Sequence, residues 1–173
     1  MDIVWTVGHS TRPQEDFLAL LAVHGVQAIA DVRRFPASRR HPHFNRDDMA
    51  RWLGEAGLRY QHFDDLGGRR KPDPASGNTA LRHPSFRGYA DYMATEPFEQ
   101  ALARLIDWAR GERVAVMCAE AVWWQCHRSL ISDALSARGC EVRHILDASK
   151  TRVHRINELA RIEAGRVCYP GLL

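Results

Sequence analysis

The stretch that most constrains the fold runs from Arg113 to Arg128, with the sequence RVAVMCAEAVWWQCHR. It begins with a continuous apolar run, passes through a short polar segment and leads into a helical pattern near Ser129. A short apolar run with β-branched residues that gives way to a helical period is typical of a buried parallel strand followed by a helix. The reactive side chains are therefore predicted where the strand ends and the helix begins, which is where open α/β sheets bind their ligands.

The rest of the chain repeats this alternation of strand and helix. Strand patterns lie at 3–7, 28–32, 58–63, 114–117 and 141–146, and helical spacing lies at 13–25, 46–56, 86–109 and 129–137. Pro97 predicts a break within 86–109. A last amphipathic helix is predicted at about 151–165, followed by an ordinary tail.

This pattern predicts an α/β fold made of one domain over residues 1–173. We expect three layers, with a mainly parallel central sheet of about five strands and helices on both of its faces.

The length and the cysteines indicate a protein that needs no covalent staples. A chain of 173 residues can bury a sufficient core. The four cysteines, at positions 118, 126, 140 and 168, form neither a CxxC pair nor a secreted disulfide framework. The amino terminus has no basic leader, and no apolar run approaches the roughly 18 residues that span a bilayer. We expect a soluble cytoplasmic protein with reduced thiols and no membrane partner.

Positive charge gathers in two stretches, although the net charge of the chain is only +3. Residues 33–46 hold five arginines and no acid, and residues 66–90 hold five basic residues against Asp73 alone. The second stretch overlaps a loop at 64–85 that is too long to be an idle connection. Such a distribution indicates an anionic partner, either a small molecule or a nucleic acid. The alternative is that these arginines are merely solvated.

Polar or ionisable side chains stand at the carboxyl ends of three predicted strands. They are His9 and Ser10, Asp31 and Arg33, and Cys118 and Glu120. Parallel strands end at one edge of a sheet, so these side chains are predicted to form one site, which packing alone explains poorly.

Each of these residues has a possible role in catalysis. Cys118 is a candidate nucleophile, although free cysteine is also among the residues most often buried for packing. Glu120 is a candidate general acid or base, or else a salt-bridge acceptor for Arg128. Asp31 and His9 would orient groups or transfer protons.

The next helix is predicted to open with Cys126, His127 and Arg128. Together with Cys118 these residues could hold a metal, but they lack the short paired spacing of structural zinc sites, and we assign no metal ligand. Walker, dinucleotide-binding and phosphatase-loop motifs are missing as well. Trp123 and Trp124 would either stack on a nucleobase or cap an edge of the core.

An ordered set of motifs extends over nearly the whole chain. It consists of VGHS at Val7 to Ser10, DVR at Asp31 to Arg33 with Pro36 and Ser38, Phe44-Asn45, Tyr60 with Leu66-Gly67-Gly68, FRGYADYM around Tyr89, and CAE…CHR at Cys118 to Arg128. In these motifs the sequence resembles the family named domain of unknown function 488. The resemblance implies an α/β fold and no established activity, so function must be argued from the site.

The main hypothesis is a small cytoplasmic enzyme that acts on a phosphate-bearing substrate, a nucleotide or a nucleic acid. Asp31 and Glu120 would suit hydrolysis or transfer at a glycosidic bond, and Cys118 would suit attack at phosphorus or an acyl carbon. The residues predicted to bind the substrate are Ser10, Arg33, Arg39, Tyr89, Cys126, His127 and Arg128. Two alternatives stay open: a non-catalytic nucleic-acid-binding module, and a metal or redox sensor that uses Cys118 and Cys126. The sequence leaves cofactor and oligomeric state unknown.

Overall fold

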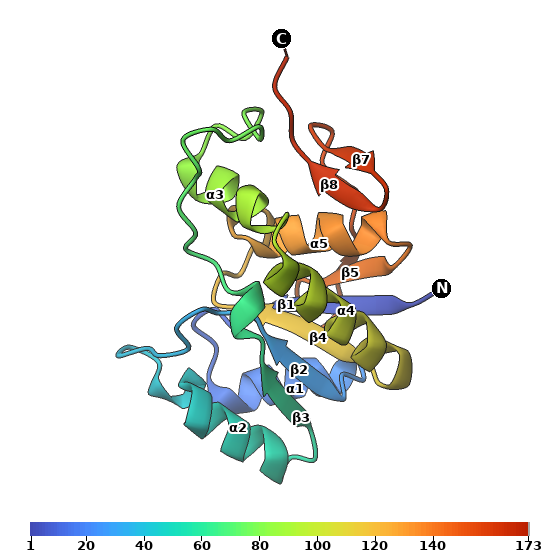
Figure 1. Ribbon diagram of the computed structural model, residues 1–173. Helices are drawn as coiled ribbons and strands as arrows, with labels where there is room; N and C mark the ends of the chain where they lie inside the picture. The colour runs from blue at the N-terminus through green and yellow to red at the C-terminus, as the bar shows by residue number, and fades with distance from the viewer. Residues whose placement is uncertain (173) are drawn as a thin grey trace.

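The computed structural model describes residues 1–172, and its centre is a six-stranded sheet in the order β3-β2-β4-β1-β5-β6 (Figure 1). The strands are β1 (Ile3–Gly8), β2 (Ala28–Asp31), β3 (Arg59–His62), β4 (Val114–Cys118), β5 (Glu141–Ile145) and β6 (Thr151–Val153). Neighbouring strands from β3 to β5 pair in parallel, and only β6 is antiparallel. The predicted α/β fold with a mainly parallel sheet is confirmed.

Helices cover both faces of this sheet. They are α1 (Gln14–Val23), α2 (Arg46–Glu55), α3 (Pro84–Tyr92), α4 (Glu96–Gly111) and α5 (Arg128–Ala137). Three 3₁₀ turns, η1 (Pro42–Phe44), η2 (Asp64–Leu66) and η3 (Trp123–Gln125), lie in the connections. The predicted break near Pro97 is confirmed, since α3 and α4 are separate helices and Pro97 lies in the first turn of α4.

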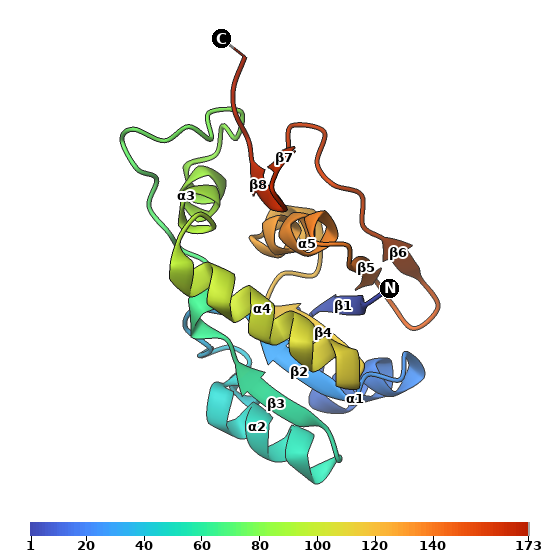
Figure 2. The same cartoon turned by 45° about the vertical axis from the view of Figure 1, so that its right-hand side comes forward.

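The two faces have separate hydrophobic cores, because successive residues of a strand point to opposite sides. In β4, Ala115 and Met117 pack towards α1 and α2, and Val114, Val116 and Cys118 pack towards α4 and α5. Figure 2 shows α4 crossing the sheet on one face and α1 and α2 on the other. Cys118 therefore faces the layer that contains α5.

The predicted amphipathic helix at 151–165 is wrong. Thr151–Val153 forms β6 at the edge of the sheet, and Arg161–Glu163 and Arg166–Cys168 form a separate hairpin, β7 and β8. Ala164 and Gly165 both have positive φ, 51° and 76°, which is the backbone of a tight two-residue hairpin turn. Pairing with β5 and this turn outweigh the weak helical spacing of the segment.

The carboxyl-terminal segment is not an ordinary tail. The Tyr169 side chain is fully buried, and its hydroxyl donates to Asp133 Oδ2 at 2.6 Å. Its backbone amide donates to Asn78 Oδ1, and its carbonyl accepts from Ala80. The long loop at 64–85 is thus held in place by the end of the chain, and further by hydrogen bonds from Ser76 and Asn78 to Asp91.

Gly8 ends β1 at a point where another segment of backbone comes very close. A Cβ atom at this position would lie 1.7 Å from the carbonyl oxygen of Glu120. Backbone cannot yield as a flexible side chain can, so only glycine lets the turn after β4 lie across the end of β1.

We expect Gly8→Ala to lower the free energy of unfolding by about 3 kcal/mol or more, because the added methyl group must push the 119–121 turn away. Urea denaturation measures the change. Gly54→Ala is the matched control: Gly54 lies within α2 with no atom within 4 Å of an added Cβ, and the change should stabilise by about 0.5–1 kcal/mol. Equal effects of the two substitutions would contradict the close approach.

Candidate functional site

Three neighbouring strands deliver the predicted site residues to one edge of the sheet. In the register of β1 with β4, Gly8 lies beside Cys118, and in that of β2 with β4, Asp31 lies beside Met117. The backbone continues this pairing beyond the strands, since the amide of His9 donates to the Cys118 carbonyl at 2.9 Å. His9, Asp31 and Cys118 therefore meet at this edge, which we call the carboxyl edge.

Asp31 is fully buried and its carboxylate is already engaged. Arg33 Nε donates to Oδ1 at 2.9 Å, Arg33 Nη2 donates to Oδ2 at 2.7 Å, and the Tyr60 hydroxyl also donates to Oδ2. A carboxylate that accepts a bidentate guanidinium and a phenol has little capacity left for a reacting group. Asp31 thus fixes Arg33 in position and is poorly placed as a general base or nucleophile.

His9 is a neutral donor and acceptor in the same cluster. Its Nδ1 donates to the Ser10 carbonyl at 2.8 Å, and its Nε2 accepts from Arg33 Nη1 at 3.3 Å. Burial, with Arg33 contributing, lowers the pKa of His9 to about 4. The ring stacks on Phe44 with a centroid distance of 4.1 Å. His9 is therefore held as the uncharged imidazole at neutral pH.

Two cysteines from different elements are in contact at the carboxyl edge. The Sγ atoms of Cys118 and Cys126 are 3.1 Å apart. Cys118 ends β4 and is only 2% exposed, and Cys126 lies half-buried between η3 and α5. The sequence placed both residues in one site, but their direct contact depends on the turn that brings the chain back over β4.

The backbone groups next to the two sulfur atoms have opposite partial charges. Cys126 Sγ accepts the backbone N–H of Arg128 at 3.4 Å, whereas Cys118 Sγ lies 3.6 Å from the Glu120 carbonyl oxygen. The hydrogen bond that Cys118 makes to Cys126 is the main cause that holds the pKa of the Cys126 thiol well below its usual value, and the nearby His127 and Arg128 add to this effect. The hydrogen bond with Cys126 and burial raise the pKa of Cys118. Negative charge is thus favoured on Cys126, and Cys118 keeps its proton.

Arg128 carries a buried positive charge with no direct carboxylate partner among the described residues. Its side chain is 1% exposed, and its Nη2 donates to the carbonyls of Glu120 at 3.0 Å and Ala121 at 3.4 Å. Its Nε is buried without a hydrogen-bond partner. Burial and the nearby Arg128 charge lower the pKa of Arg12. The interior of the carboxyl edge therefore has a positive potential.

A chain of buried hydrogen bonds links Arg128 to Asp133. Arg128 Nη1 contacts Thr6 Oγ1 at 3.4 Å, Thr6 Oγ1 contacts His144 Nδ1 at 2.6 Å, His144 Nε2 contacts His154 Nδ1 at 2.8 Å, and His154 Nε2 contacts Asp133 Oδ1 at 2.7 Å. With neutral imidazoles, one assignment of protons satisfies every link, each group donating towards Asp133. Burial and the neighbouring His154 lower the pKa of His144 to about 2, in agreement with a neutral ring. The charge of Arg128 is thus balanced at a distance.

His127 joins the cysteine pair to both basic stretches. Its Nε2 contacts the Val32 carbonyl at 2.7 Å, next to Arg33, and a Cβ added to Gly68 would lie 2.9 Å from its Nδ1. Tyr89 packs against the imidazole with a centroid distance of 5.1 Å. The segment from Cys126 to His127 therefore lies against the start of one basic loop and the turn that precedes the other.

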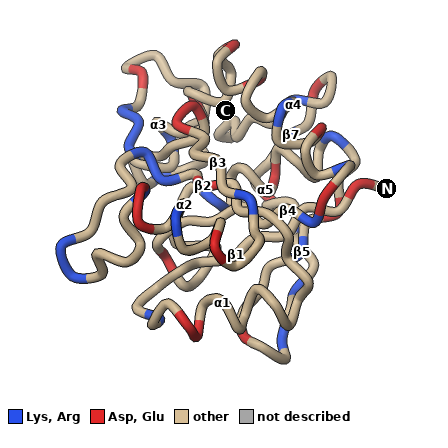
Figure 3. The backbone as a smooth tube through the Cα atoms, turned by 90° about the horizontal axis from the view of Figure 1, so that it is seen from below, with Lys and Arg blue, Asp and Glu red and all other residues tan. Residues whose placement is uncertain are grey.

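The two basic stretches meet around an exposed aromatic side chain. Arg34 Nη1 donates to the Arg69 carbonyl at 2.7 Å. The guanidinium groups of Arg34 and Arg69 lie 5.5 Å and 5.6 Å from the ring centre of Phe35, which is 60% exposed. Figure 3 shows Lys and Arg along the backbone of these loops, near α2 and α3. The structure thus joins two charge clusters that are separate in the sequence.

The other predicted site residues lie at the rim or beneath it. The Glu120 side chain is exposed in the turn after β4, and Arg39 is exposed in the first basic loop. Ser10 is half-buried with a φ of 52°, and its amide donates to the Ala119 carbonyl. Tyr89 is buried and donates to the Leu66 carbonyl at 2.7 Å, which supports the turn beneath His127.

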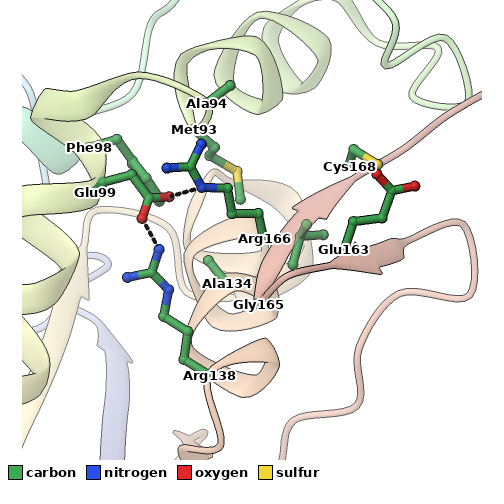
Figure 4. Close-up of a pocket in the computed structure, with 11 residues that line it drawn as sticks. Met93, Ala94, Phe98, Glu99, Ala134, Arg138, Glu163, Gly165, Arg166 and Cys168 are labelled. Carbon is green, nitrogen blue, oxygen red and sulfur yellow. Dashed lines mark hydrogen bonds and ion pairs between the residues drawn. The ribbon is translucent and has the colours of Figure 1, made fainter.

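Two cavities of the described structure lie away from the carboxyl edge. One, of about 220 Å³, lies between α4, α5 and the hairpin of β7 and β8 (Figure 4). Its polar wall is Glu99, which forms ion pairs with Arg138 and Arg166. The other, of about 760 Å³, is an open groove at the opposite edge of the sheet, lined by Gln27, Arg59 and Glu112 among others. Neither of these two cavities is lined by the cysteine pair.

The sequence analysis missed most of the buried polar network. Tyr60, Thr6, Asp133, His144 and His154 were not predicted as part of the site. A signal existed for the two histidines and Asp133, because buried charged or imidazole groups need partners. Asp133, His144 and His154 lie in separate segments of the chain, so the sequence does not show that they are hydrogen-bonded to one another.

Among residues 1–172 there is no group of three or more His, Cys, Asp or Glu side chains placed to hold a metal ion. Within the same residues, none of the helices combines the length and the apolar character required to cross a membrane.

Most of the chain matches a known protein family. The family model described as domain of unknown function DUF488 matches residues 13–135. The chain belongs to the DUF488 family. The matched region includes Asp31, both cysteines of the pair and Asp133, whereas His9 and the links of the hydrogen-bond chain at Thr6, His144 and His154 lie outside it. No curated protein and no solved structure matches the chain.

We expect Asp133→Asn to lower the free energy of unfolding by about 3 kcal/mol, because the carboxylate that balances Arg128 and accepts from His154 and Tyr169 is lost. Urea denaturation at neutral pH measures the change. The control is Asp107→Asn, which removes an exposed ion pair with Arg110 and should leave the free energy of unfolding nearly unchanged. A similar small cost for both variants would contradict the balancing role of Asp133.

Proposed function

We propose that this DUF488 protein is a cytoplasmic enzyme that uses the Cys126 thiolate to transfer or hydrolyse a group on a phosphate-bearing substrate. One observation carries the proposal. Cys126 Sγ contacts the Cys118 thiol and accepts the backbone N–H of Arg128, and Cys126 is the half-buried residue of the pair whereas Cys118 is buried. This surrounding favours an activated nucleophile. The cytoplasmic assignment rests on the four free thiols, which suit a reducing compartment.

The geometry favours a thiolate route over one based on two carboxylates. Asp31 is buried and saturated with hydrogen bonds, so it cannot approach a glycosidic bond. Glu120 is the carboxylate that remains accessible for proton transfer. The sequence suggested Cys118 as the nucleophile. We therefore assign this role to Cys126 instead.

The phosphate would bind at the basic loops rather than at the buried arginines. Arg33 and Arg128 are buried, and most of their N–H donors are taken up by Asp31, His9, Thr6 and backbone carbonyls. These two side chains would therefore act on a substrate through their electrostatic potential and not through direct contacts. Arg34 and Arg69 lie on the loops that flank His127, and their guanidinium groups are the ones gathered at the surface. A phosphate held there would place the rest of the substrate near Cys126.

In the proposed reaction, the Cys126 sulfur attacks an electrophilic phosphorus or acyl carbon and the bond to the leaving group breaks. Glu120 donates the proton that the leaving group needs. The ionised Glu120 then takes a proton from water, whose oxygen breaks the bond to Cys126 and regenerates the thiolate.

The test measures thiol reactivity and turnover with the same variants. Alkylation of Cys126 by iodoacetamide, followed by mass spectrometry, should persist well below the usual thiol pKa of about 8.5. Phosphorus NMR of the reduced protein with a mixture of nucleotides should show conversion that Cys126→Ser lowers about a thousandfold or more. Cys168→Ser, at a half-buried thiol without a neighbouring sulfur atom, is the control and should keep full activity. Full turnover in Cys126→Ser would refute the assignment.

The Phe35 cluster favours a second candidate, binding of a single-stranded nucleic acid without catalysis. An exposed ring between two guanidinium groups offers a base a stacking surface and offers the backbone two cations.

For this candidate we expect an oligonucleotide to bind with an affinity that falls steeply as salt increases, measured by fluorescence anisotropy. Phe35→Ala should weaken binding by about 1–3 kcal/mol, because a stacked base loses its platform. Val153→Ala, at an exposed apolar residue of β6, is the control and should bind normally. An affinity that changes neither with salt concentration nor in Phe35→Ala would exclude this candidate.

A further inference from the structure

We propose that Cys126 and Cys118 form a peroxide-responsive pair, in which a hydroperoxide oxidises Cys126 and Cys118 then closes a disulfide. This goes beyond the proposed catalysis, since it gives the same site a second chemistry and a reversible way to be switched off. The consequence for activity rests on the proposed function, but the oxidation itself needs no substrate and can be tested alone.

The geometry supplies a disulfide partner in contact. The two Sγ atoms are 3.1 Å apart, and a disulfide bond of about 2 Å requires only a small further approach. Cys118 is fixed at the end of a central strand, but Cys126 has extended backbone (φ −142°, ψ 173°) between η3 and the start of α5. Because Cys126 belongs to neither regular element, it can shift towards Cys118 without breaking a strand or a helix.

The unequal burial of the sulfur atoms gives the two cysteines an order of reaction. Cys126 is half-buried, whereas Cys118 is only 2% exposed, so a small peroxide is expected to react with Cys126 first. The backbone amide of Arg128 stabilises negative charge on Cys126, and the thiolate is the form that reacts with peroxides. Cys118 then stands directly behind the oxidised sulfur, where only an intramolecular thiol can arrive.

The chemistry balances in two steps. The Cys126 thiolate attacks one oxygen of the hydroperoxide, the O–O bond breaks, and the released oxygen leaves as water or an alcohol after taking a proton, so that Cys126 becomes a sulfenic acid. The Cys118 sulfur then attacks Cys126, the S–O bond breaks, and the hydroxide takes the Cys118 proton to leave as water. Two thiols lose two electrons in all, the peroxide gains them, and an external dithiol can reverse the change.

The other two cysteines provide internal controls. Cys140 is buried at the start of β5, Cys168 lies on β8, and neither contacts another sulfur atom. A general sensitivity of the protein to oxidants would affect accessible Cys168 as well, whereas the proposed pair would be oxidised first.

The experiment treats the reduced full-length chain with hydrogen peroxide, then blocks free thiols and maps the peptides by mass spectrometry. We expect a cross-linked peptide containing Cys118 and Cys126 that dithiothreitol releases. In Cys118→Ala, Cys126 should accumulate as a sulfenic acid that dimedone traps. In Cys126→Ala, Cys118 should stay reduced over the same time, and Cys168→Ala should behave as the unmodified protein. Alanine keeps the site apolar, so these variants avoid burying a hydroxyl group.

Two results would overturn the proposal: oxidation of Cys118 at an unchanged rate in Cys126→Ala, or a stable sulfenic acid at Cys126 in the unmodified chain with no cross-link. The proposed function fails separately. A cross-link in a protein whose reduced form converts no nucleotide supports the redox pair and rejects the catalysis. If the reduced form converts a nucleotide but peroxide produces no cross-link, the result supports the catalysis and rejects the redox pair.

Discussion

The carboxyl edge depends on one buried positive charge, the guanidinium of Arg128. A buried cation without a carboxylate beside it must be compensated by dipoles and by charge further away. The carbonyls of Glu120 and Ala121 supply the dipoles, which fixes the turn after β4 across the end of β1. That turn can lie there only because position 8 is glycine. Thus the conformation of the site turn follows from how Arg128 is satisfied.

Compensation at a distance ties the site to the other end of the chain. The chain of hydrogen bonds through Thr6, His144 and His154 ends at Asp133, which also receives the hydroxyl of Tyr169. The carboxyl-terminal segment is thereby a structural partner of the site, although it lies outside the residues that define the family match. The same network explains why His154 is buried beside β6 in a segment whose neighbouring residues are exposed.

The backbone groups beside the two sulfur atoms distinguish two cysteines that are chemically identical in the sequence. Cys126 lies on the side of the Arg128 amide, and Cys118 lies on the side of the Glu120 carbonyl. An amide hydrogen stabilises a thiolate and a carbonyl oxygen opposes it, so the same local backbone activates one sulfur and protects the other. This asymmetry would explain both the proposed catalysis by Cys126 and the proposed disulfide between oxidised Cys126 and Cys118.

The sequence by itself determined the α/β class, the sheet built around 114–118, and the arrival of His9, Asp31 and Cys118 at one edge, because apolar runs and helical periods are local properties of the chain. It also located the two basic loops. Only the tertiary structure decided that Asp31 is saturated by Arg33 and Tyr60, that Cys126 contacts Cys118 and is the less buried of the two, and that three short strands replace a helix within residues 151–168. These outcomes depend on hydrogen bonds between residues distant in sequence, and such partners are set by packing rather than by any local pattern.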